Sequence, residues 1–488
     1  VDSFKEFINY FGRGPKVSFT IRAKEKTDYS LKLNPESQFH LYNSLRLFYA
    51  NGGGACYIIS VGDYSKGAKL KELQEGLELL IAEQEPSIVA SPDAISLDPK
   101  ECYELYRDIL THCGRETRDR FAIFDVPGGD QARSYDQKDV INGFRDGVGH
   151  NNLAYGAAYY PYLNTTVVSG NELSFKNVSN PNELVKLLVR EAEIKYLGGV
   201  SSTPAKPAAK GAPKTAPTAS KVDSRSQQKF DEVKKEIEKL KTNEGSSSVL
   251  DQNLKAISGT YNAILREIKE IANVMPTVGA IAGIYANVDN AVGVHKAPAN
   301  IGLNSVLSPT VNVTGPVQED LNLPVNGKAV NAIRSFMGKG ILVWGARTLD
   351  GNSQDWKYIN VRRTLLMIEQ SVKSAVENYI FEPNTPQTWM RVRIAIENFL
   401  TSQWKRGALM GISPAEAYEV AIGLGDTMTP EDVLDGVMRI SVFLSVSRPA
   451  EFIEITFEQR MLEPVDESAE EGEDEEGDDG GDEGAAEE

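Results

Sequence analysis

Cysteine and histidine are scarce in this chain of 488 residues, which has three cysteines and four histidines. The cysteines are odd in number and have no CxxC spacing, so the sequence indicates neither a zinc knuckle nor a disulfide framework. The residues are Cys56, Cys102 and Cys113. The histidines have no HxxH or HExxH spacing, which argues against a metal centre built on paired histidines. We therefore expect no metal and no cofactor.

Long apolar runs are also missing. No segment approaches the roughly 18 to 20 apolar residues that cross a bilayer, so we expect no membrane insertion. The first residues, VDSFKEFINYFGRG, lack the basic and apolar regions of a signal peptide. These features predict a chain made in the cytoplasm.

Basic residues are outnumbered by acidic ones, 52 to 69, and the net charge is −17. Residues 466–488 hold 14 acids and no bases, so the rest of the chain carries only −3. A nucleic-acid-binding surface needs a basic stripe that neutralises phosphates, and none is visible. We expect no nucleic-acid binding, and a disordered acidic tail over residues 466–488.

Sequence motifs for catalysis are absent or out of order. There is no G-x-S-x-G and no GK[ST] string. The glycines in NGGGACYIISVG, residues 51–62, follow a helical pattern and precede a strand pattern, the reverse of a phosphate-binding loop. Asp125 stands at a strand end, where α/β enzymes place acids, although a helix cap would suit the same place. An α/β hydrolase or nucleotide-dependent enzyme using Asp125 and His150 is the alternative function.

Helical and strand patterns alternate over the first 200 residues. We expect helices at 3–12, 37–54 and 98–114, and strands at 55–62, 120–127 and 157–163. The alternation resumes after Met275, with long helices at 359–381 and 385–409 and strand patterns at 439–447 and 451–461. This order favours the α/β class.

Residues 199–274 interrupt the alternation. A linker rich in Pro, Ala and Lys fills 199–225. Two apolar stripes at heptad spacing follow within 226–274 and predict an antiparallel helical hairpin. The stripes are Phe230, Val233, Ile237 and Leu240, then Leu254, Ile257, Tyr261, Ile264, Ile268 and Ile271. The hairpin is either an interaction arm or a solvated element packed on itself.

Several long strings resemble contractile tail sheath proteins. The first is VMPTVGAIAGIYANVDNAVGVHKAPANIGL, residues 274–303, and the strings WGARTL and YINVRR further along are quite specific. Strings that follow in the family's order include NAIRSFMGKGILVWGARTL, DWKYINVRRTLLMIEQSV, FEPNTPQTWMRVRIAIENFLTSQWKRGALMG and SRPAEFIEITF. Segments before residue 165 also match, so about 380 residues are covered. Family members usually begin with a P-G-V-Y-like segment that is not present here.

The resemblance implies a fold and a set of domains. Sheath proteins have a subtilisin-like α/β domain without a catalytic triad, followed by an α+β C-terminal domain. The implied divisions are an N-terminal region (1–84), the α/β domain (85–350) with its insertion, the C-terminal domain (351–465) and the acidic tail.

The resemblance also implies a mechanical function and its partners. Sheath subunits stack around an inner tube and contract to drive it through a target envelope, using stored conformational energy rather than hydrolysis. The implied partners are other sheath subunits, the inner tube, and baseplate and terminal cap proteins, within a phage-like tail or contractile injection particle. Because this chain matches both halves of the sheath, we favour such a particle over a type VI secretion system.

Three groups of site residues follow from the resemblance. Phe399, Lys405 and Arg406 are expected to grip the inner tube. A strand that joins a neighbouring subunit is expected over Phe452, Ile453, Glu454, Ile455, Thr456 and Phe457. The structural motif residues are Gly283, Lys296, Asn300, Trp344, Arg347, Arg362 and Arg363. Gly279, Gly283 and Gly293 are expected to allow close packing or tight turns, and His295 has a structural role.

Overall fold

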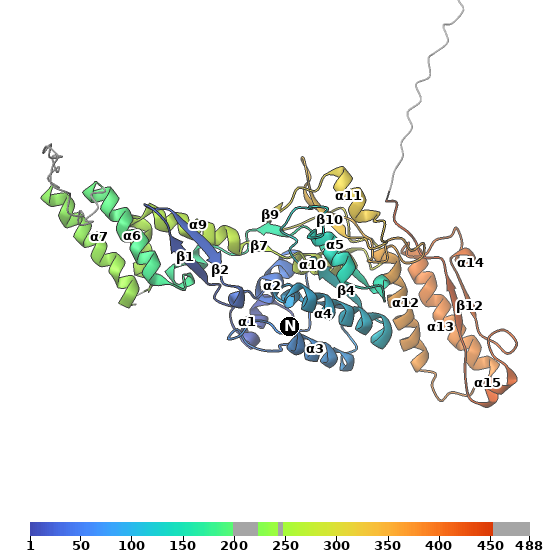
Figure 1. The fold of residues 1–488 in the computed structure, drawn as a ribbon. Coiled ribbons are helices and arrows are strands. Elements are labelled where there is room, and N and C mark those ends of the chain that lie inside the picture. Colours follow the sequence, from blue (N-terminus) through green and yellow to red (C-terminus); the bar gives the residue numbers. More distant parts are fainter. Residues whose placement is uncertain (199–222, 243–246, 452–488) are drawn as a thin grey trace, which may run out of the picture. The chain divides into compact units, whose positions relative to one another are not determined.

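The computed structural model describes residues 1–198, 223–242 and 247–451 (Figure 1). Residues 1–449 form one compact unit. Its helices are α1 (Phe4–Phe11), α2 (Leu41–Ala50), α3 (Leu70–Leu79), α4 (Pro99–Thr111), α5 (Val140–Gly147), α6 (Pro181–Leu197), α7 (Ser224–Thr242), α8 (Ser247–Ile257), α9 (Gly259–Ala272), α10 (Val278–Ala291), α11 (Gly315–Asn322), α12 (Ile359–Glu377), α13 (Pro386–Lys405), α14 (Pro414–Ala417) and α15 (Pro430–Leu434). The helices expected near residues 3–12, 37–54 and 98–114 are confirmed as α1, α2 and α4.

A six-stranded mixed sheet has the order β3-β4-β5-β10-β11-β8. Its strands are β3 (Ile88–Ala90), β4 (Phe121–Asp125), β5 (Gly156–Tyr160), β8 (Ile301–Gly302), β10 (Asn331–Phe336) and β11 (Gly340–Trp344). The first four in the sheet order run parallel, and β11 and β8 are antiparallel to their neighbours. The α/β class is confirmed.

Alternate residues of β4 enter different hydrophobic cores, one on each face of this sheet. Phe121 and Ile123 join a core that includes α10, whereas Ala122 and Phe124 join a core that includes α4 and α5. This is the period of two that a strand buried on both faces must show. The sheet therefore lies between two layers of helices.

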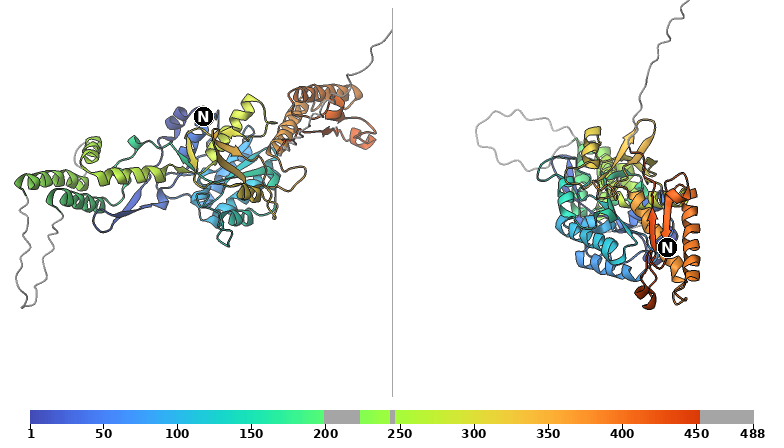
Figure 2. Two further views of the ribbon diagram at one scale, coloured as in Figure 1. Left: turned by 90° about the horizontal axis from the view of Figure 1, so that it is seen from above. Right: turned by 90° about the vertical axis from the view of Figure 1, so that its right-hand side faces the viewer.

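Smaller sheets complete the fold. β1 (Phe19–Ala23) pairs with β2 (Tyr29–Leu33), and β6 (Leu163–Thr165) lies between β7 (Val274–Met275) and β9 (Val306–Pro309). β12 (Tyr418–Ala421) pairs antiparallel with β13 (Ser441–Leu444). Together with α12 and α13 these last two strands form a separate core around Ile396 and Leu400 (Figure 2).

The heptad stripes are helical, as predicted, but they do not pack only on each other. α7 packs most extensively against α6, which precedes the predicted insertion (Figure 1). Phe230 and Ile237 of α7 share a core with Leu184 and Leu188 of α6. The second stripe is divided between α8 and α9 at Ser258, whose hydroxyl caps α9. Most of the linker, 199–222, lies outside the described residues.

The strand expected at 55–62 is wrong for this structure. Residues 53–63 contain no helix, strand, turn or bend, and Tyr57 is 51% exposed. The composition is typical of a strand, but a strand needs a neighbouring backbone to bond along its length. Among the described residues only one such pair is found here, Cys56 with Val1, and it is not continued into a ladder.

Candidate functional site: the junction of helices α10, α12 and α13

Two glycines bring α10 and α2 into close contact (Figure 1). A Cβ on Gly279 would overlap backbone atoms of Ser44, and one on Gly283 would overlap the carbonyl oxygen of Phe48. Four-residue spacing puts both glycines on one face of α10. Their small size therefore sets the distance between the helices, as the sequence suggested. Gly293, after the helix, has φ +126°, which favours glycine.

Asp125 caps the N-terminus of α10. Its Oδ1 accepts from the Thr277 amide (2.6 Å), the Thr277 hydroxyl (2.6 Å) and the Val278 amide (3.1 Å). Burial raises the pKa of Asp125 to about 6, although these hydrogen bonds favour the charged form and oppose the rise. Of the two readings of Asp125, cap and catalytic acid, the geometry shows the cap. His150 is exposed, and none of these bonds involves it.

Two arginines on α12 attach this helix to the central α/β core. Arg363 forms a bidentate ion pair with Asp289 of α10, with distances of 2.9 and 2.5 Å. The Arg363 side chain is 5% exposed and that of Asp289 is 21% exposed. The guanidinium of Arg362 lies 3.9 Å from the ring centroid of Tyr155 and 4.6 Å from that of Trp356. Two buried cations are thus held by a carboxylate and by aromatic faces.

The loop from Gly293 to Asn300 bonds to the start of α12, and His295 in this loop is near the charged end of α13. The carbonyl of His295 accepts from Asn360 Nδ2 (2.9 Å), which also donates to Ser447 O (3.2 Å). Burial lowers the pKa of His295, and the positive charges of Arg406 and Lys296 lower it further. The backbone of His295 thus joins this loop to Asn360, at the start of α12.

Among the described residues, Lys296 and Asn300 make hydrogen bonds through their backbones and not through their side chains. Both side chains are exposed, and no side-chain hydrogen bond of either is found within the described part of the chain. Their backbones make the contacts: the Lys296 amide donates to Gly293 O (3.1 Å) and the Asn300 amide to Val343 O (2.7 Å). Asn300 has φ +58°, a conformation that asparagine tolerates better than most residues.

Trp344 and Arg347 lie at the end of β11. The Trp344 ring packs on Phe336, with 4.5 Å between ring centroids. Arg347 is buried, and its Nη1 donates to the carbonyls of Asn322 (3.0 Å) and Gly351 (3.1 Å). Arg347 therefore closes the loops that follow α11 and β11.

The residues expected to grip a tube lie at the C-terminal end of α13. Lys405 and Arg406 are exposed, and neither has a side-chain hydrogen bond or ion pair with another described residue. Phe399 is half-buried and packs on the C-terminal core, whose nearest fully buried member on the helix is Leu400. The cations are thus available, whereas Phe399 is largely a core residue. The other predicted contact segment, Phe452–Phe457, lies outside the described residues.

Sequence reasoning missed the partners of the buried arginines. Asp289 is 74 residues from Arg363, and Tyr155 is 207 residues from Arg362. Asp289 lies inside the family string at 274–303, but nothing in that string indicates which cation pairs with it. Asn360 was quoted within YINVRR without a role, and it joins the loop at His295 to Ser447.

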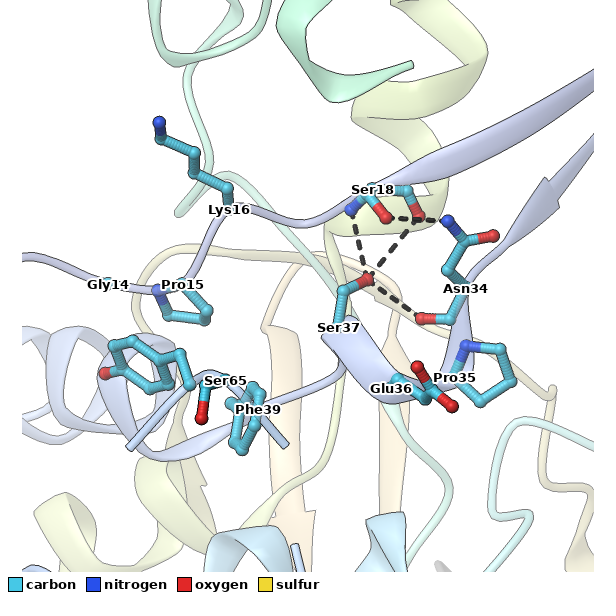
Figure 3. Close-up of a pocket in the computed structure, with 11 residues that line it drawn as sticks. Gly14, Pro15, Lys16, Ser18, Asn34, Pro35, Glu36, Ser37, Phe39 and Ser65 are labelled. Atoms are coloured by element: carbon cyan, nitrogen blue, oxygen red, sulfur yellow. Dashed lines mark hydrogen bonds between the residues drawn. The ribbon is translucent and has the colours of Figure 1, made fainter. Parts of the chain in front are cut away.

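An open pocket lies between the N-terminal segment and the loop after β2 (Figure 3). Three of its polar residues bond one another: Ser37 Oγ donates to Asn34 O (2.8 Å), and Asn34 Nδ2 donates to Ser18 Oγ (2.7 Å). Polar groups satisfied in this way do not converge on a ligand. In the described ranges, no group of three or more His, Cys, Asp or Glu side chains could hold a metal ion. No helix among these residues is long and apolar enough to cross a membrane.

Residues 352–460 match the family model of the phage tail sheath C-terminal domain. The tail sheath protein of Vibrio phage KVP40 is 23% identical over 212 residues, which are 43% of this chain and 29% of the relative. The major tail sheath protein of Serratia phage KSP20 is 26% identical over 152 residues, which are 31% of this chain and 37% of the relative. The chain thus spans about a third of the length of these relatives.

Solved structures match more of the chain. The contracted helical sheath of the anti-feeding prophage is 28% identical, with a TM-score of 0.52 over 86% of this chain and 81% of that one. The contracted PVC sheath complex of an extracellular contractile injection system is 24% identical, with a TM-score of 0.55 over 94% of this chain and 86% of that one. The resemblance to sheath proteins is therefore confirmed: the chain carries a phage tail sheath C-terminal domain on a body with the fold of contractile injection system sheaths.

Proposed function

We propose that this chain is a structural subunit of a contractile sheath, which surrounds an inner tube and contracts to drive it through a target envelope. The observation that carries the proposal is the similarity to contracted sheaths over more than four fifths of the chain, joined to the sheath C-terminal domain at 352–460. The comparisons give no support to the hydrolase alternative, and the Asp125 carboxylate is occupied as a helix cap.

The proposed partners are further copies of this chain, the inner tube, and baseplate and terminal cap proteins. Chains from baseplate structures of the anti-feeding prophage are also similar in fold, with TM-scores of 0.53 and 0.58. We place the subunit in a phage-like tail or contractile injection particle that is assembled after synthesis in the cytoplasm. It works mechanically, without a cofactor.

The finer domain scheme is also part of the proposal. We assign a subtilisin-like α/β domain to 85–350 and a C-terminal domain to 351–465, and the separate core around Ile396 and Leu400 supports the second of these. The insertion at 199–274 is assigned to the outer surface of the sheath. Because α7 shares a core with α6, removing α7 to α9 would expose apolar side chains of α6. The acidic tail at 466–488 remains outside the described residues.

Two contacts are proposed for assembly. Lys405 and Arg406 grip the tube in the extended state, and their exposure suits contacts that must break on contraction. Exposed ion pairs contribute only about 0 to 1 kcal/mol each. Each subunit can therefore release the tube easily, whereas the contacts of many subunits together can hold the sheath in its extended state. The segment Phe452–Phe457 adds a strand to a neighbouring subunit through backbone hydrogen bonds.

Electron microscopy of the overexpressed chain tests the proposal. We expect striated cylinders, because sheath subunits that are not held on a tube assemble in the contracted form. A preparation that contains only dispersed monomers at high protein concentration would contradict the sheath function.

A further inference from the structure

His112 and Arg120 are two buried side chains that meet near the end of α4. His112 begins a π-helical turn, His112–Thr117, which follows α4, and Arg120 directly precedes β4. Each of the two residues is 1% exposed. Arg120 Nη1 lies 3.1 Å from His112 Nε2. Because an arginine side chain is always charged and has only donors, Nε2 must be the acceptor, and the buried histidine is neutral.

Arg120 uses its other donors to hold the turn that follows α3. Its Nη1 also donates to Leu80 O (2.6 Å), and its Nη2 donates to Glu83 O. Leu80 packs on the core, but Ile81 is 55% exposed, and Glu83 is exposed as well. The end of the turn is therefore held by the Arg120 guanidinium more than by packing.

Three charged groups surround the His112 ring. They are Arg120, Glu116 and Asp119. Glu116 Oε2 lies 3.3 Å from His112 Nδ1, and Asp119 Oδ1 lies 3.2 Å from Arg120 Nε. Burial lowers the pKa of His112 and the charge of Arg120 lowers it further, whereas the two carboxylates oppose these effects.

The remaining neighbours of His112 carry no charge in acid. Burial raises the pKa of the Cys113 thiol, and Asn152 packs against Gly114 in the same turn. The turn after α3 contributes only backbone carbonyls. Since the folded chain binds the His112 proton less tightly than the unfolded chain, stability from this group is full above the ordinary pKa of 6.5. It is lost as the pH falls through the pKa of His112 in the folded chain.

We propose that His112 and Arg120 form an acid-sensitive latch on the link between α3 and β3. When Nε2 takes a proton from water, it can no longer accept a hydrogen bond, and two cations stand 3.1 Å apart. The guanidinium moves away, so the carbonyls of Leu80 and Glu83 lose their donors. Acid therefore releases residues 80–84, while β3 stays paired with β4. The inference is independent of the sheath function.

Hydrogen exchange of the full chain, followed by mass spectrometry from pH 7 to pH 4.5, tests the latch. Exchange is expressed as a protection factor, which removes the effect of pH on the chemistry of exchange. The Glu83 amide donates to Leu80 O (3.2 Å) in the turn. Its protection should fall about fivefold or more at pH 4.5, and the protection of α4 should change less than about twofold.

Two pairs of variants separate the latch from a general effect of acid. Glu116→Gln removes a carboxylate that favours the protonated ring, so the pH at which protection is lost should fall. Glu104→Gln, an exposed position on α4, is its control and should leave that pH unchanged. His112→Gln should abolish the pH dependence, because an amide oxygen accepts from Arg120 without titrating. His40→Gln is its control, since burial alone lowers the pKa of His40 to about 4.

Four results would overturn the proposal. The first is protection of the turn that is equal at pH 7 and pH 4.5. The second is a pH dependence that survives in His112→Gln, and the third is an opening pH that stays the same or rises in Glu116→Gln. The fourth is loss of protection in α4 together with the turn, which would show that acid unfolds the whole unit. If His112→Gln does not fold, Glu116→Gln still decides, because Glu116 is exposed.

Discussion

The start of α12 and the end of α13 carry cations in opposite surroundings. Arg363 is buried and bonded through both terminal nitrogens to Asp289, whereas Lys405 and Arg406 are exposed. Removing one partner of a buried pair leaves a charge without compensation, but an exposed cation loses little when its partner leaves. The contrast teaches that two neighbouring helices can combine a buried attachment with exposed cations, which suit the proposed contact that releases easily.

Breaking the buried Arg363–Asp289 pair should have the largest effect on stability. Asp289→Ala leaves the Arg363 guanidinium buried without its carboxylate, and we expect a loss of about 3 to 5 kcal/mol in the free energy of unfolding. Denaturant titration measures the loss. The matched control is Arg448→Ala, because Arg448 and Asp355 are exposed and 3.7 Å apart. That control should lose about 0 to 1 kcal/mol. Equal losses in both variants would contradict the proposed difference between the buried pair and the exposed cations.

Close packing of α10 on α2 should give the next largest effect. Gly283→Ala would drive a methyl group into the backbone of α2, and we expect a loss of about 1 to 3 kcal/mol. Gly302→Ala is the control, since nothing lies within 4 Å of an added Cβ there. Thermal unfolding of both variants measures the difference, and an unaltered melting temperature for Gly283→Ala would refute the packing argument.

Asp125 should give an effect that depends on pH. Its pKa in the folded chain, about 6, is above its ordinary value of 3.8, so the folded state binds the proton more tightly. Stability from this group is full below about pH 4 and is lost as the pH rises through 6. Asp125→Asn keeps the oxygen acceptor without the charge, so its melting temperature relative to wild type should increase from pH 4 to pH 7. A difference that is constant with pH, or that falls, would contradict the raised pKa of Asp125.

The exposed cations should give the smallest effect on stability. Lys405→Glu combined with Arg406→Glu should change the free energy of unfolding by about 0 to 1 kcal/mol, because neither side chain has a partner among the described residues. Contracted cylinders should form normally, while extended sheath-on-tube particles become fewer in micrographs. Equal numbers of extended particles at moderate salt would require the tube-facing assignment to be abandoned.

Local patterns in the sequence predicted local structure well. Gly279 and Gly283 were expected to allow close packing or tight turns, and Asp125 at a strand end pointed to a cap or an acid. The heptad stripes predicted helices but not that α7 packs on α6, because an apolar stripe does not name its partner.

The sequence alone did not predict which distant residues pair or which strands are neighbours. The contacts of Arg362 and Arg363 join residues 207 and 74 positions apart, which only the tertiary fold brings together. The strand predicted at residues 55–62 does not form, for a related reason. Their composition favours a strand, but a strand forms only where a neighbouring backbone completes the ladder.

Helical reconstruction of the assembled particle, extended on its tube and contracted, tests the central claim most directly. We predict that the Arg363–Asp289 pair is kept in both states, whereas Lys405 and Arg406 contact the tube only in the extended state. A particle in which the pair breaks on contraction, or in which the end of α13 faces away from the tube in the extended state, would contradict the account.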